Sequence, residues 1–169
     1  MVRAMWFTAL FYLFFLITLP KEQIFYEAQR VLREHGFLLG FKELKESFLG
    51  LDAKKGYLKS DGSELADIGA GSAKVFLFYN SLEFEKVDLK LPQRVEIGEL
   101  RLIYSVADPF KVAVEAKIEG VCDVRGVYEL KSGILSLAIV DVKNPAIVKS
   151  LFWGVKKDKD GNYLFRQKI

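Results

Sequence analysis

Apolar and polar residues alternate most regularly between residues 110 and 142. From Phe110 to Ile118 every second residue is apolar, and most of the residues between them are charged. The alternation resumes after Gly120 and again after Ser132-Gly133, a pair typical of a tight turn. Because successive side chains of a strand point to opposite faces, the pattern predicts three antiparallel strands with one dry and one solvated face.

Further upstream the alternation changes phase at two places. Leu82 and Phe84 share one parity, Val87 and Leu89 share the other, and a second change falls at Gly98. Since a shift of one residue moves every side chain to the opposite face, each change predicts a bulge or a bend. Bulges curl a sheet. We therefore expect a mainly β fold with minor α, in which residues 37–169 form a curved antiparallel sheet, either a jelly roll or a taco-like meander.

Two upstream segments interrupt the alternation. Val75–Tyr79 holds five apolar residues in a row, which predicts a strand covered on both faces. We expect the concave core of the sheet on one face and the helix described next on the other, with lipid as the alternative cover. The runs Ser47–Asp52 and Tyr57–Ser60 are shorter and flank Lys55-Gly56, which predicts a break between them.

Two segments have helical spacing. Between residues 21 and 36 the apolar residues fall on one face, Pro20 stands where an entry proline is tolerated, and Gly36 stands where a left-handed cap is expected. This predicts an amphipathic helix packed on the sheet. Asn144-Pro145 supplies a cap and a first-turn proline for a second, short helix near residues 145–153.

The chain begins with an apolar run from Ala4 to Leu19. A helix of this length reaches about 24 Å, and Val2, Pro20 and snorkelling basic residues extend it toward the roughly 30 Å of a bilayer core. We expect residues 1–20 to be an uncleaved transmembrane anchor with a cytoplasmic N-terminus next to Arg3. A cleaved signal peptide is the main alternative, although the run lacks small residues at its end; a buried core helix is the third.

The sequence contains few residues able to carry chemistry. Cys122 and His35 are the single residues of their kinds, which argues against a metal site built on them, and Cys122 falls on the dry face of a predicted strand. Glu83 and Glu85 share a strand face and could form a carboxylate pair, but the preferred interpretation is that they form the solvated side opposite Leu82 and Phe84. No phosphate-binding glycine loop appears in the sequence. We therefore expect no enzyme, and assign no catalytic, cofactor or metal residue.

Charge adds one local feature. Lys and Arg outnumber Asp and Glu by only 25 to 22, so direct binding of nucleic acid is not expected. Seven basic residues nevertheless gather in residues 143–169, against Asp158 and Asp160. A solvated final hairpin is the preferred interpretation, and a surface for anionic lipid, nucleic acid or an acidic partner is the alternative.

The order of these segments resembles AsmA-like proteins and the type II secretion protein N family. The resemblance is carried by the succession of short strand elements and by a glycine-spaced strand pair at residues 124–137: Gly50-Leu51, Asp61-Gly62, Val75–Tyr79, Leu82–Leu91, Gly126, Gly133, Leu135 and Leu137. It implies a single-pass bacterial inner-membrane protein with a periplasmic β domain and with neither activity nor cofactor.

Two functions follow from this setting. The first is a non-enzymatic assembly component of a type II secretion-like machine, or of a related DNA-uptake system, that binds envelope subunits. The second is a lipid-binding or lipid-transfer protein of the cell envelope, in which the curled sheet holds acyl chains. Four aromatic residues are the candidate contacts for a protein partner or for lipid: Phe76, Phe78, Tyr79 and Trp153.

Overall fold

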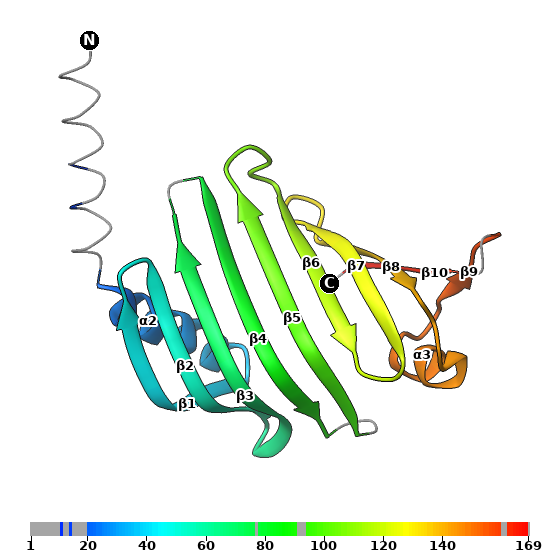
Figure 1. Ribbon diagram of the computed structural model, residues 1–169, viewed down its shortest axis with the longest axis horizontal. Helices are drawn as coiled ribbons and strands as arrows, with labels where there is room; N and C mark the ends of the chain where they lie inside the picture. Colours follow the sequence, from blue (N-terminus) through cyan, green and yellow to red (C-terminus); the bar gives the residue numbers. More distant parts are fainter. Residues whose placement is uncertain are drawn as a thin grey trace, which may run out of the picture.

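The computed structural model (Figure 1) describes Phe11, Phe14 and residues 20–76, 78–90, 94–159 and 162–168. In these residues the chain forms an open ten-stranded antiparallel sheet with helices α2 (Lys21–Glu34) and α3 (Pro145–Leu151) packed on it. The strands are β1 (Phe37–Ser47), β2 (Gly50–Ser60), β3 (Ser63–Val75), β4 (Tyr79–Leu89), β5 (Val95–Ser105), β6 (Lys111–Ile118), β7 (Cys122–Glu129), β8 (Ile134–Val140), β9 (Lys156–Lys157) and β10 (Tyr163–Lys168).

The strands follow one another across the sheet in the order of the sequence. Each of β1 to β7 pairs with the strand that follows it in the sequence, and β10 then lies beside β8 with β9 at the outer edge. This order is a meander, whereas a jelly roll would bring strands distant in sequence side by side. The mainly β, antiparallel prediction is thus confirmed. The strongly alternating segment of residues 110–142 accounts for β6, β7 and β8.

A line of irregular residues crosses β2 to β5 where the alternation changes phase. We call it the crease: Lys55, Gly69, Lys86 and Gly98. The pairing of β2 to β5 skips these four positions, and Lys55 and Lys86 have φ values of 54° and 53°, in the left-handed region. Between β5 and β6 the register shifts at the same place. The crease keeps Phe84 and Val87 in one apolar cluster despite their opposite parity.

The crease also corrects one prediction. Lys55-Gly56 does not separate two short strands; it lies inside β2. The left-handed Lys55 bends the strand without ending it. At Gly56 the ring of Phe41 occupies the position where a Cβ would stand, so the missing side chain allows the aromatic ring to lie on the strand.

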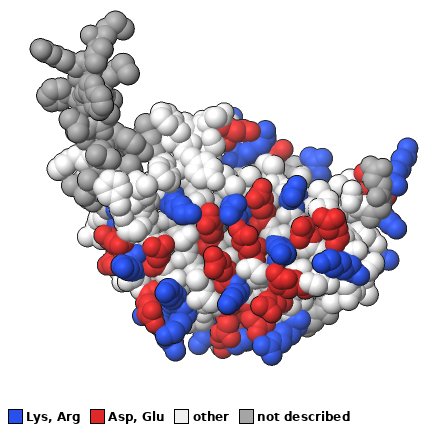
Figure 2. All heavy atoms as spheres, in the orientation of Figure 1, with Lys and Arg blue, Asp and Glu red and all other residues white. Residues whose placement is uncertain are grey.

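The two faces of the sheet differ in chemistry and in cover. Figure 2 shows acidic and basic side chains spread over the face toward the viewer. On the opposite, apolar face, α2 covers the β1 side of the sheet: the Phe25 and Phe41 ring centroids lie 5.8 Å apart, and Gln29 Nε2 donates to the Leu39 carbonyl at 2.7 Å. At the other end of the sheet, α3 buries Val148 completely in a cluster with Ile139.

α3 begins where its sequence predicts. The Asn144 side chain accepts a hydrogen bond from the backbone N–H of Ile147, and Pro145 occupies the first turn, where a missing N–H is tolerated. After the helix, the Phe152 ring packs edge-on against Phe165 of β10 at 5.7 Å. The helix is thereby fixed to the last long strand of the sheet.

The prediction for Val75–Tyr79 is wrong. β3 ends at Val75 and β4 begins at Tyr79, so the segment is a hairpin connection and not a strand covered on both faces. Its tight geometry comes from Phe76, whose N–H donates to the Tyr79 carbonyl and to the Asn80 side chain, both at 3.1 Å. The helix α2, which was expected to cover the segment, makes its principal strand contacts with β1.

The predicted anchor at residues 1–20 lies mostly outside the described residues. Phe11 and Phe14 are helical and exposed, and Pro20 directly precedes α2. Among the described residues, no helix has both the length and the apolar character needed to span a membrane.

Candidate functional site

The apolar face holds an open groove between the regions covered by α2 and α3. It has a volume of about 480 Å³ and lies over the ends of β3 to β6 that are farther from the crease. Its apolar lining comes from successive strands and from the β7–β8 connection: Ala73, Val75, Leu82, Leu102, Tyr104, Val112 and Leu130. We call this feature the open groove.

Strand register explains how these side chains meet. Leu82 pairs directly with Leu102, and Tyr104 pairs directly with Val112, so each pair shares the apolar face. Leu82 remains 43% exposed although it lies on the apolar face of a central strand. Contiguous exposed apolar surface on a folded protein marks a site of interaction with a partner, a ligand or a membrane.

Two of the polar side chains that line the open groove, Lys74 and Asn80, already have partners. Lys74 places its ammonium 3.3 Å from Glu83, a residue of the charged face. The Asn80 side chain accepts the Phe76 N–H at 3.1 Å. The groove therefore offers its occupant an apolar surface, and recognition there depends on burial of hydrocarbon.

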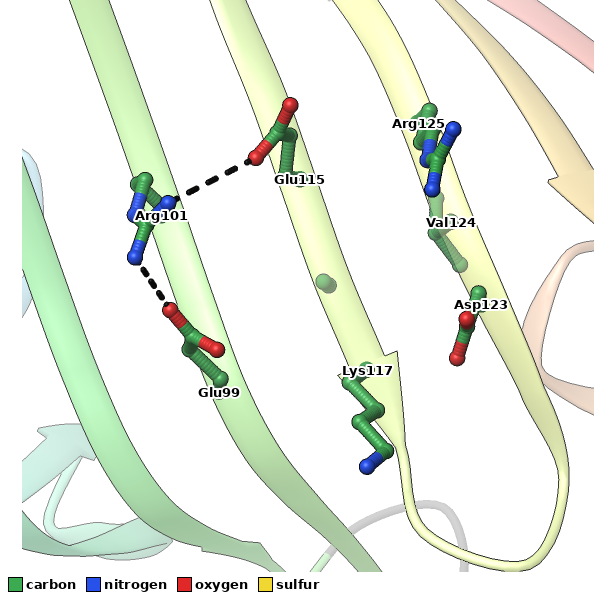
Figure 3. Close-up of a pocket in the computed structure, with 8 residues that line it drawn as sticks. Glu99, Arg101, Glu115, Lys117, Asp123, Val124 and Arg125 are labelled. Atoms are coloured by element: carbon green, nitrogen blue, oxygen red, sulfur yellow. Dashed lines mark hydrogen bonds and ion pairs between the residues drawn. The ribbon is translucent and has the colours of Figure 1, made fainter.

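The opposite face carries a shallow charged depression centred on Arg101 (Figure 3). The guanidinium lies 2.6 Å from Glu99, 3.3 Å from Glu83 and 3.9 Å from Glu115. Glu83, Arg101, Glu115 and Arg125 stand in one cross-strand row, so opposite charges alternate from β4 to β7. Such rows stabilise neighbouring strands modestly.

This charged depression is a weak candidate for chemistry. Glu83 of the conceivable carboxylate pair is held by Lys74 and Arg101 and stands on the face opposite Leu82, as the alternation predicts. Within the described part of the chain, no group of three or more His, Cys, Asp or Glu side chains could hold a metal ion. Ion pairs on an exposed face are typical of a solvated surface.

The candidate contacts from the sequence are divided between two places. Phe76, Phe78 and Tyr79 lie in the β3–β4 hairpin, next to Val75 of the open groove, and Phe78 and Tyr79 are 68% and 42% exposed. Trp153 is 91% exposed but follows α3, after the opposite end of β8. The structure thus groups the first three beside the groove and separates Trp153 from them.

The sequence did not single out the groove residues on β5 and β6. In the sequence, the pattern around these residues is that of any strand with one apolar face: Leu102, Tyr104 and Val112. Alternation predicts which face of a strand is apolar, but it does not predict whether another part of the protein covers that face. The only available signal was the change of phase at Gly98, which places Leu102 and Tyr104 on the apolar face.

Comparison of the chain with protein-family models, with curated proteins and with solved structures found no match. The resemblance to AsmA-like proteins and to the type II secretion protein N family stays a prediction. Functional inference therefore depends on the open groove and on its surroundings.

Proposed function

We propose that the protein binds the acyl chains of envelope lipids in the open groove. The observation that carries this proposal is the exposure of Leu82 within a groove whose lining side chains are mostly apolar. A volume of about 480 Å³ falls within the roughly 300–1,000 Å³ of typical small-molecule sites. An acyl chain matches such a lining, since burying each methylene contributes about 0.8 kcal/mol.

The surroundings of α2 support a membrane setting. The Glu22 N–H donates to the Glu46 side chain at 3.0 Å, which fixes the start of α2 beside the end of β1. The apolar run from Ala4 to Leu19 immediately precedes this point. As an inner-membrane anchor, that run would hold the β domain against the periplasmic surface of the bilayer, within reach of lipid.

The alternative is assembly of a secretion-like machine through protein contacts. The exposed Phe78 and Tyr79 favour it, because aromatic side chains are enriched in protein interfaces. The two functions differ in what touches the groove. Acyl chains should contact the lining of the sheet, whereas an assembly partner should contact the hairpin and leave the groove empty of lipid.

Site-specific photocrosslinking of the full-length chain in cells tests the proposal. A photoreactive amino acid replaces Leu102, which lines the open groove, and in a matched control it replaces its neighbour Ile103, which points to the charged face. We expect lipid adducts by mass spectrometry at position 102 and none at position 103. Protein adducts alone at position 102, or equal lipid labelling at both positions, would refute acyl-chain binding in the groove.

A further inference from the structure

The described hairpin turns at the two edges of the meander differ in chemistry. The connections β1–β2, β3–β4, β5–β6 and β7–β8 share one edge, because strand direction alternates. Among the described residues of these connections, five large apolar side chains are each between 47% and 68% exposed; we call them the rim: Phe48, Phe78, Val106, Phe110 and Leu130. At the opposite edge, the β2–β3 and β6–β7 turns carry Asp61-Gly62 and Glu119-Gly120.

Backbone hydrogen bonds join neighbouring connections of the rim. The Val106 N–H donates to the Phe78 carbonyl at 3.1 Å, and the Leu130 N–H donates to the Phe110 carbonyl at 2.8 Å. Lys131 places its ammonium 3.7 Å from the centre of the Phe110 ring. The connections therefore present their apolar side chains from an ordered edge, with a cation beside one of the aromatic rings.

The chain enters the domain at the same edge. β1 runs toward the rim, and Glu46 near its end accepts the hydrogen bond from the Glu22 N–H. Pro20 therefore lies at the rim side of the sheet, directly after the apolar run from Ala4 to Leu19. If that run is inserted in a bilayer, the rim faces the surface of the same bilayer.

We propose that the rim inserts into the interfacial layer of the phospholipid bilayer that holds the N-terminal segment. Aromatic and aliphatic side chains partition into this layer, and lysine accompanies them by extending its ammonium to the headgroups. Val75 and Leu130 line the open groove at its rim end, so the inserted rim places the groove opening at the lipid surface. This proposal rests on the membrane setting of the proposed function and not on what occupies the groove.

Depth-dependent fluorescence quenching tests the rim. The full-length chain is reconstituted into vesicles of phosphatidylethanolamine and phosphatidylglycerol, with a fluorophore on Phe78→Cys or Phe110→Cys. The controls carry it on Asp61→Cys at the opposite edge, or on Trp153→Cys, an equally hydrophobic exposed position outside the rim. Cys122 is buried and free, so a Cys122→Ala background prevents labelling there.

We expect lipids with a nitroxide near the headgroup to reduce emission at positions 78 and 110 roughly twofold or more, since interfacial apolar side chains lie about 5–10 Å deep. Positions 61 and 153 should be unaffected. Equal quenching at all four positions, or rim labels that are shielded from water but not quenched by lipid, would overturn the proposal; the second result would indicate contact with another protein copy. Lipid crosslinking at position 102 is measured separately, so failure of the rim and failure of the groove are distinguishable.

Discussion

Two neighbouring regions of the apolar face are built on the same strands but differ in the exposure of their side chains. On β4, Val87 is 6% exposed and Leu82 is 43% exposed, although the two residues are only five positions apart in the sequence. Val87 belongs to the closed region beyond the crease, with Ala66 and Ile68, where Phe41 and Phe84 pack on it. Leu82 belongs to the open groove. The comparison teaches that the apolar face of a strand becomes a core only where further apolar side chains pack on it.

The largest expected difference between covered and open positions is in thiol reactivity. Cys122 is 2% exposed, and burial, helped by the charge of Asp123, raises the pKa of its thiol to about 11. At mildly alkaline pH the reactive thiolate is then rarer than in a solvated thiol by a factor on the order of a hundred. A cysteine in the groove, Leu82→Cys, should therefore react with iodoacetamide at least that much faster than Cys122. Comparable rates in the native protein would show that the buried cluster around Cys122 opens readily.

Alanine substitutions provide the matching comparison of stability. Ile139 is completely buried beneath α3, so Ile139→Ala should lower the free energy of unfolding by about 2–5 kcal/mol. Leu82→Ala removes a side chain that already contacts water and should lower it by about 1 kcal/mol or less. Denaturant titration of the full-length chain in mild detergent measures both. A larger loss for Leu82→Ala would mean that the groove is part of the core.

Sequence reasoning predicted the strands and the bends better than the cover. Alternation identified β6 to β8, and its phase changes located the crease at Lys86 and Gly98, because backbone parity is a local property. It failed at Val75–Tyr79, where hydrogen bonds from Phe76 to Tyr79 and Asn80 close a hairpin. Five apolar residues in a row resemble a buried strand whether they meet a core or stand at an exposed edge.

The position of the open groove could not be predicted from the sequence, because it also depends on what covers the sheet. Its existence depends on how far α2 and α3 extend over the apolar face, and this is decided by contacts between residues distant in sequence, such as Phe25 with Phe41 and Phe152 with Phe165. No local pattern near Leu102 or Tyr104 reports where those helices end. The rim residue Phe78 was a candidate contact, but its companions Phe48 and Phe110 were not, because the meander that aligns them is a tertiary feature.

The crease separates the two regions, and a glycine substitution measures its strain. Lys86 holds a left-handed backbone with φ of 53°, so Lys86→Gly should stabilise the protein by about 1 kcal/mol. Lys45→Gly, at an ordinary position of β1, should destabilise it by about 0.5–1 kcal/mol. Thermal unfolding of both variants and of the wild type tests whether the two glycine substitutions change the stability in opposite directions. Destabilisation by both would show that the Lys86 side chain contributes more than its backbone strain removes.

The smallest effect should come from the ion pairs on the charged face behind the closed region. Asp67 lies between Ala66 and Ile68 on β3 and is 2.8 Å from Lys90, whose hydrogen bond lowers the pKa of Asp67 below its ordinary value of 3.8; a hydrogen bond with Glu64 lowers it further. A lowered carboxyl pKa contributes stability that is present above pH 3.8 and is lost as the pH falls through the folded-state pKa. Because both side chains are largely solvated, the contribution is small.

The variant Lys90→Gln isolates that contribution. NMR titration should show the pKa of Asp67 moving up toward its ordinary value, because the hydrogen-bonding ammonium is gone. The stabilities of wild type and variant should differ slightly at neutral pH and converge in acid, below the lowered pKa, where Asp67 is protonated in both. A loss at neutral pH as large as that of Ile139→Ala would contradict the comparison, since the closed region would then owe its stability to charges on the opposite face as much as to its cover.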